Sequence, residues 1–98
     1  MKSKQGPIIF IEDDLDDQEI LKEVLHSLKI SNTLLLFSDG MEAFSYLKTN
    51  EDQPFLILCD INLPKMNGLE FREKVVGDER LRKKSIPFFF YPCKPGYR

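Results

Sequence analysis

The chain has 98 residues, of which 42% are hydrophobic and 31% are charged, a composition expected of one globular domain and a length too short for two. Its net charge of −2 excludes the strongly basic balance of many nucleic acid-binding proteins. Residues 1–60 carry 5 Lys or Arg against 12 Asp or Glu, whereas residues 61–98 carry 9 against 4. The densest basic run, residues 80–84 (RLRKK), has no interleaved aromatic residue, which favours a solvated loop over a nucleic acid site.

No stretch is typical of a targeting or membrane segment. The apolar residues 7–11 (PIIFI) are fewer than the roughly 7 to 15 of a signal-peptide core, and no run approaches the ~20 residues of a membrane span. We therefore expect a soluble, cytoplasmic protein that does not contact a membrane. The two cysteines lack the spacing of a zinc site or a disulfide framework. Cys59 lies inside an apolar run, so it is predicted to be a buried, reduced thiol.

The first predicted elements are a strand at residues 8–11 and a helix after it. The run IIFI has no polar break, which is typical of a strand buried on both faces. Asp16, with Glu19 as its capping-box partner, is predicted to begin the helix. Apolar residues then recur at helical spacing, at Ile20, Leu21, Val24, Leu25 and Leu28. His26, the single histidine, falls on the opposite face, so we expect it to be exposed and not catalytic.

Strands and helices continue to alternate along the chain. Further strands are predicted at residues 33–37, 55–59 and 86–91. A helix opened by Asp39 and Glu42 follows the second strand, with Ala43, Phe44 and Leu47 facing inward. A loop from Asp60 to Gly68 leads to a third helix that ends near Gly77 and carries Leu69, Phe71, Val75 and Val76. This order implies right-handed βαβ units and a mostly parallel sheet covered by helices.

Acidic residues follow two of these strands directly. Asp60 comes after the third strand, and Glu12, Asp13 and Asp14 come after the first. Ligands of open parallel sheets bind beyond the carboxyl ends of the strands, so we expect Glu12, Asp13 and Asp60 to meet there. Two carboxylates ~5 Å apart repel each other by roughly 3 kcal/mol at an effective dielectric constant of 20, and a divalent cation removes that repulsion.

The ligands available at this edge favour Mg²⁺. They are hard oxygens with no cysteine or histidine beside them, and Mg²⁺ is usually bound by one or two carboxylates, a carbonyl and several waters. The alternative is that the acidic run is only a helix N-terminus stabilised by the macrodipole. We expect that simpler role for Asp16 and Asp17.

The residues EDD (12–14) and DINLPKMNG (60–68), in this βαβ order, resemble the receiver domain of two-component response regulators. The likeness covers residues 7–91 of the single predicted domain, 1–98, and leaves residues 92–98 as an atypical tail. It implies a flavodoxin-like doubly wound parallel sheet and phosphoryl transfer from a histidine kinase or a histidine phosphotransfer protein. The resemblance implies these site residues: Asp60 as phosphoacceptor, Asp13 as a direct Mg²⁺ ligand, Glu12 as a ligand through water, Asn62 as a ligand through its backbone carbonyl, and Pro64 and Gly68 as loop-shaping residues.

The sequence departs from this family after the fourth strand. Receiver domains have a Ser or Thr just past that strand and a Lys just past a fifth, and both contact the phosphoryl group. Pro92 stands at the hydroxyl position, so no switch hydroxyl is assigned. No residues remain for the family's fourth helix, fifth strand and fifth helix. Lys94, followed by Pro95, mimics the family's Lys-Pro pair but follows the wrong strand, so it is a weak candidate and the phosphate lysine stays unassigned.

Three functions therefore compete. The leading hypothesis is a phosphoacceptor signalling domain that acts through protein contacts and turns over no substrate. The second is a degenerate receiver, a binding module independent of phosphorylation. The third is a small aspartate-nucleophile phosphatase, but the usual acid/base position two residues past Asp60 is Asn62, which argues against turnover.

We also expect self-association. Without a fifth strand, the aromatic segment Phe88–Tyr91 would be an exposed edge of the sheet, and such an edge is a template for pairing with another chain. The sequence therefore predicts a homodimer in which a second copy covers this edge. Direct contact with nucleic acid is not expected.

Overall fold

The computed structural model describes residues 6–63 and 65–91, in which four strands alternate with helices. In chain order the elements are β1 (Ile8–Ile11), α1 (Leu15–Ser27), β2 (Leu34–Phe37), α2 (Gly40–Thr49), β3 (Leu56–Asp60), α3 (Gly68–Gly77), α4 (Glu79–Lys84) and β4 (Phe88–Tyr91). The predicted strands are all present, and the last three begin slightly later than the sequence indicates. Residues 92–98 lie outside the described part of the chain.

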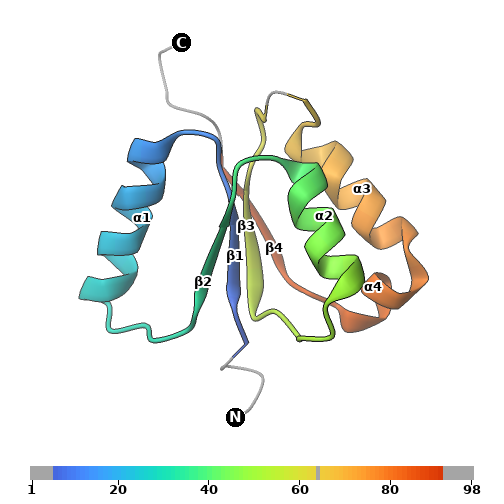
Figure 1. The fold of residues 1–98 in the computed structure, drawn as a ribbon, viewed down its shortest axis with the longest axis horizontal. Helices are drawn as coiled ribbons and strands as arrows, with labels where there is room; N and C mark the ends of the chain where they lie inside the picture. The colour runs from blue at the N-terminus through green and yellow to red at the C-terminus, as the bar shows by residue number, and fades with distance from the viewer. Residues whose placement is uncertain (1–5, 64, 92–98) are drawn as a thin grey trace.

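The strands form one parallel sheet in the order β2-β1-β3-β4. β1 is central, and its Ile9 lies in register with Leu35 of β2 and Ile57 of β3. Helix α1 covers one side of the sheet, whereas α2, α3 and α4 lie on the other (Figure 1). This arrangement confirms the predicted flavodoxin-like, doubly wound sheet. Since the strands are parallel, all of their carboxyl ends lie at one edge.

The main core lies between the sheet and the α2–α3–α4 layer. Alternate residues of a strand point to opposite faces, so one face of β1 contributes Ile9 and Ile11 to this core. Its other members include Leu47 of α2, Phe71 of α3 and Leu81 of α4. All four residues of β1 are buried, as predicted for a strand covered on both faces.

Helix α1 begins earlier than the sequence indicates. Its N-cap is Asp14, whose Oδ1 accepts hydrogen bonds from the backbone N–H groups of Asp16 (2.8 Å) and Asp17 (3.3 Å). The predicted cap at Asp16 with a box partner at Glu19 is therefore wrong. In a run of acidic residues several positions carry the chemistry of a cap, and the backbone after β1 places Asp14 at the cap position. His26 is exposed, as predicted.

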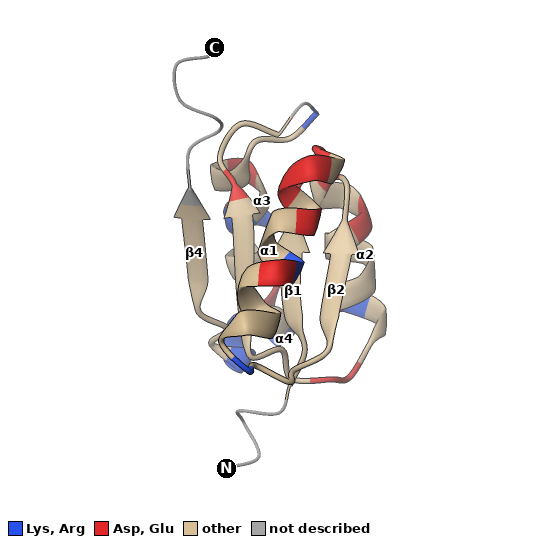
Figure 2. Cartoon of the chain, turned by 90° about the vertical axis from the view of Figure 1, so that its left-hand side faces the viewer, with Lys and Arg blue, Asp and Glu red and all other residues tan. Residues whose placement is uncertain are grey.

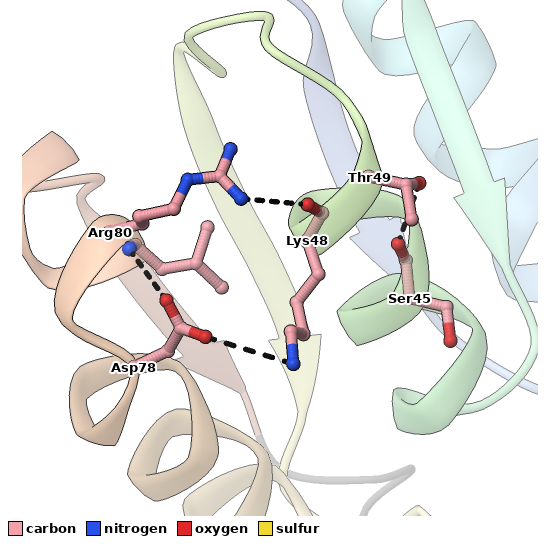
Figure 3. Close-up of polar contacts among 6 residues, drawn as sticks. Ser45, Lys48, Thr49, Asp78 and Arg80 are labelled. Carbon is pink, nitrogen blue, oxygen red and sulfur yellow. Dashed lines mark hydrogen bonds and ion pairs between the residues drawn. The ribbon is translucent and has the colours of Figure 1, made fainter.

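The basic run 80–84 is not the solvated loop expected from the sequence, because it forms α4. Asp78 caps this helix by accepting a hydrogen bond from the N–H of Leu81 (3.1 Å), and the Leu81 side chain is only 1% exposed. Figure 3 shows the junction with α2, where Arg80 Nη1 donates to the carbonyl of Lys48 (3.1 Å) and Lys48 Nζ lies 4.0 Å from Asp78 Oδ2. One apolar residue in a six-residue helix gives no periodicity that the sequence could reveal.

The α1 side of the sheet carries exposed apolar residues. Ile20, Val24 and Leu28 form a row along α1 at a spacing of four residues and are 58%, 43% and 63% exposed. Phe89 of β4 is 53% exposed. Phe88 and Phe90 point to the other side, where they pack against the core and are half-buried. Among the described strands β4 is an edge of the sheet, as expected, but of these three aromatic side chains only Phe89 is exposed.

None of the helices in the described ranges is both long enough and apolar enough to span a lipid bilayer.

We predict that Leu81→Ala will lower the free energy of unfolding by about 2–5 kcal/mol, because it removes a fully buried side chain and leaves a cavity between α4 and the sheet. Lys83→Ala, on the exposed side of the same helix, should change stability by less than about 0.5 kcal/mol. Urea unfolding followed by circular dichroism measures both. Equal, small effects would mean that α4 does not pack as described.

Candidate functional site

Three carboxylates meet at the carboxyl edge of the sheet. Ile11 of β1 is in register with Cys59 of β3, so Glu12, which directly follows β1, lies beside Asp60, the last residue of β3. One carboxylate oxygen each of Glu12, Asp13 and Asp60 lies within 4.8 Å of the other two. Figure 2 shows acidic residues at this end of the molecule, at the tip of β3 and over the start of α1. The sequence prediction that these three residues would meet is borne out by their positions.

Asp60 is one of the two buried carboxylates of this group. Its side chain is fully buried, and Oδ1 accepts a hydrogen bond from the backbone N–H of Asn62 (2.9 Å). Oδ2 is buried too, and no described residue donates a hydrogen bond to it. A buried carboxylate oxygen without a partner is unfavourable by about 1–3 kcal/mol or more. The site is therefore suited to a cation or an electrophile that can contact Oδ2.

Glu12 is also fully buried, and it is held at three points. Its N–H donates to the carbonyl of Phe37 in β2 (2.9 Å), its Oε2 accepts from the N–H of Asp14 (3.0 Å), and its carbonyl accepts from Gln18 Nε2 (2.7 Å). Asp13, between these held residues, is exposed. The site thus combines two buried carboxylates with one that reaches solvent.

Asp14 and Gln18 belong to the surroundings of the site, and the sequence reasoning missed both. Asp14 was placed at the strand end without a role, although it caps α1 and contacts Glu12. Gln18 is not among the predicted site residues. Its signal was present in the sequence, since a polar residue at position 18 continues the helical spacing of Leu21 and Leu25 on the face toward the sheet.

The loop after β3 brings the start of α3 against Asp60. The N–H of Gly68 donates to the carbonyl of Ile61 (2.9 Å), and a Cβ at position 68 would lie 2.9 Å from the carbonyl oxygen of Asp60 and 3.2 Å from Phe90 Cδ1. Only glycine permits this approach without a shift of the backbone. This geometry gives the predicted loop-shaping role of Gly68 a physical basis. Pro64 lies outside the described residues.

Cys59 lies directly below the acidic site, on the core side of β3. Burial and, to a smaller extent, the negative charges of Asp60 and Glu12 together raise the pKa of its thiol to about 12. The thiol is therefore protonated at neutral pH and is not a nucleophile. The prediction of a buried, unpaired cysteine is confirmed.

The donor set fits a hard divalent cation. The group of Glu12, Asp13 and Asp60 offers carboxylate oxygens, the ligands that Mg²⁺ prefers, and the unpartnered Oδ2 of Asp60 is among the atoms that could contact it. The structure brings Asn62 next to Asp60 through its N–H, and ligation by the Asn62 carbonyl stays a prediction. Pro92 and Lys94, the two positions in the atypical tail, lie outside the described residues.

Known proteins are similar to this chain in sequence and in fold. The chain is 32% identical to response regulator Rcp1 of Synechocystis sp. over 78% of its own length and 55% of that protein. It is 33% identical to chemotaxis protein CheY1 of Helicobacter pylori over 91% of its own length and 68% of that protein. The chain thus spans about half the length of Rcp1 and about two thirds of CheY1.

Solved structures give the same result. The phosphorylated cyanobacterial phytochrome response regulator RcpA superposes with a TM-score of 0.78 at 30% identity, over 94% of this chain and 68% of that one. The Mn²⁺-bound form of response regulator Rcp1 gives a TM-score of 0.75 at 26% identity over the same shares. In sequence, the protein-family model named response regulator receiver domain matches residues 8–89. Because that match covers most of the chain and includes both strand ends of the acidic site, the chain belongs to the response regulator receiver domain family.

Proposed function

We propose that this chain is a phosphoacceptor of two-component signalling, in which Asp60 receives a phosphoryl group from a phosphohistidine. The observation that carries the proposal is the buried, unpartnered Oδ2 of Asp60 inside a group of three carboxylates. Phosphorylation of a relative, RcpA, supports the assignment. Signalling by this chain would then depend on contacts with other proteins.

The residues of the site have distinct parts in the proposed transfer. A carboxylate oxygen of Asp60 attacks phosphorus, the P–N bond to the histidine breaks, and the imidazole leaves with the electron pair and is protonated by solvent. The N–H of Asn62 holds the other carboxylate oxygen and so fixes the orientation of the nucleophile. Glu12 and Asp13 would hold Mg²⁺, which when bound offsets the negative charges of nucleophile and phosphoryl group.

Two other functions stay possible outcomes of the test. A degenerate receiver would keep the fold, with or without the metal site, but accept no phosphoryl group. An aspartate-nucleophile phosphatase would need an acid/base two residues past Asp60. That position is the exposed Asn62, whose neutral amide does not transfer protons at neutral pH. We therefore propose that the chain accepts a phosphoryl group without sustained turnover.

The proposed partners are a histidine kinase or histidine phosphotransfer protein in the cytoplasm, and a second copy of this chain. Among the described strands, β4 pairs only with β3, so its outer edge is available to another chain. The exposed Phe89 and the exposed row on α1 lie on the same side of the sheet. A homodimer that covers Phe88–Tyr91 would remove part of this apolar surface from water. No direct contact with nucleic acid is proposed.

Incubation with acetyl phosphate and Mg²⁺ is predicted to add one phosphoryl group to the wild-type chain and none to Asp60→Asn. Intact-mass spectrometry, followed by peptide mapping, measures the adduct. Asp39→Asn is the control, because Asp39 caps α2 and is not part of the carboxylate group. An adduct that survives in Asp60→Asn would refute the assignment, no adduct on the wild type would favour the degenerate receiver, and steady release of phosphate would favour the phosphatase.

Asp13→Asn is predicted to weaken Mg²⁺ binding at least tenfold, since it removes a ligand charge from the cluster. Asp16→Asn should have less than a threefold effect, because Asp16 lies in the first turn of α1 outside the group. Titration with Mg²⁺, followed through backbone amide chemical shifts, gives both dissociation constants. Similar losses in the two variants would mean that the acidic run acts only as a diffuse field.

Phe89→Asp is predicted to convert a dimer into a monomer, because it places a charge in the surface that the second copy would cover. Met41→Asp is the matched control: Met41 is 47% exposed but belongs to α2, on the other side of the sheet (Figure 1). Light scattering after size exclusion at high micromolar concentration gives the mass. A stable wild-type monomer would overturn the proposal of a homodimer.

A further inference from the structure

Gln18 is a buried polar residue on the inner face of α1. Its side chain is 9% exposed, and its Nε2 donates a short hydrogen bond, 2.7 Å, to the backbone carbonyl of Glu12. It shares this face of the helix with the half-buried Leu21 and Leu25. An apolar residue would fit the helix pattern equally well, so the amide needs an explanation in terms of what it contacts.

The carbonyl that Gln18 holds belongs to the peptide group between Glu12 and Asp13. A peptide group is planar, so fixing its oxygen fixes the directions in which both flanking residues leave it. Two of the three clustered carboxylates stand on these flanking residues. The register of β1 with its neighbours ends at Ile11, and beyond it the Glu12 N–H is held by Phe37. The hydrogen bond from Gln18 fixes the next peptide group, which joins Glu12 and Asp13.

The same contact ties the acidic site to the first turn of α1. The backbone N–H of Gln18 donates to the carbonyl of Asp14 (3.1 Å), and the N–H of Asp14 donates to Glu12 Oε2 (3.0 Å). Glu12 is therefore held through its carbonyl by one residue of the helix and through its carboxylate by the cap of the same helix. A shift of α1 would move Glu12 and Asp13 relative to Asp60.

We propose that Gln18 is a positioning residue of the acidic site, and that its amide sets the affinity of Glu12, Asp13 and Asp60 for a divalent cation. The inference rests on the proposed function, because it presumes that these carboxylates bind Mg²⁺. An amide at position 18 can donate a hydrogen bond to the Glu12 carbonyl, whereas a carboxylate cannot. A glutamate at this position would have no proton to donate to the Glu12 carbonyl and would add a fourth negative charge near the site.

Gln18→Met tests the proposal, because methionine has a similar length and no donor. Residues that orient metal ligands typically change affinity by about 10- to 100-fold when replaced, and we expect a loss of about tenfold in Mg²⁺ affinity. Amide chemical shifts of Asp13 and Asp60 during titration give the dissociation constant. Unfolding in EDTA gives the stability of the metal-free fold separately.

Gln53→Met is the matched control. Gln53 Nε2 also donates to a backbone carbonyl, that of Lys84 (3.0 Å), but it precedes β3, at the opposite end of the sheet from Asp60. Its replacement removes a bond of the same type and should leave Mg²⁺ affinity unchanged within twofold. A purely structural role of Gln18 would lower stability in EDTA and leave Mg²⁺ affinity equal to that of Gln53→Met, and this result would overturn the proposal.

A measurement on the wild type covers the case in which Gln18→Met does not fold. The side-chain amide signals of Gln18 should shift during the Mg²⁺ titration with the same dissociation constant as the backbone amides of Asp13 and Asp60. Signals of Gln18 that stay still while those amides shift would overturn the positioning role alone. Absence of any shift at Asp13 and Asp60 would overturn the metal site itself, and the positioning role with it.

Discussion

The parallel sheet places carboxylates close together, and their mutual repulsion is the constraint that the surrounding structure must offset. Glu12 and Asp60 extend neighbouring parallel strands in register, and both are fully buried. Burial weakens the screening of their charges, and Asp13 adds a third charge to the group. A fold that keeps such a group needs hydrogen-bond donors around it and a ligand of opposite charge within it.

The backbone supplies most of these donors. The N–H of Asn62 serves Asp60, and the N–H of Asp14 serves Glu12, so each buried carboxylate has one amide directed at it by the turn that follows its own strand. Gly68 lets α3 begin against Asp60, where any side chain would collide with the backbone of the loop. Tight turns at the strand ends therefore position the site, and the apolar core beneath it holds the strands in register.

The sequence was sufficient to predict the elements that are marked by apolar runs or by capping residues. Apolar runs located every strand, and Asp39, which accepts from the N–H of Glu42, marked the start of α2. The meeting of Asp60 with the first strand followed from the order of the elements alone. Helix α4 was missed because its single buried residue, Leu81, lies among charged residues, two of which, Arg80 and Lys84, contact carbonyl groups distant in sequence.

The position of a cap within a run of acidic residues was also beyond the sequence. Asp14 and Asp16 have the same side chain, and which of them caps α1 depends on the path of the backbone after β1. The helical spacing places Gln18 on the inner face of α1, but its partner is a backbone carbonyl, which the type of the partner residue does not reveal. Local patterns identified the groups that carry charge, whereas the contacts that orient them became visible only in three dimensions.

The two sides of the sheet have different consequences for function. The acidic site draws on β1, β3 and the first turn of α1, and its geometry does not involve the row of Ile20, Val24 and Leu28. Exposed apolar residues on that side can therefore be covered by another molecule without a change in the ligands of the site. A partner that contacts only the row on α1 would affect the carboxylates through the position of that helix. The bond from Gln18 to Glu12 is a contact through which a displacement of that helix would reach the site.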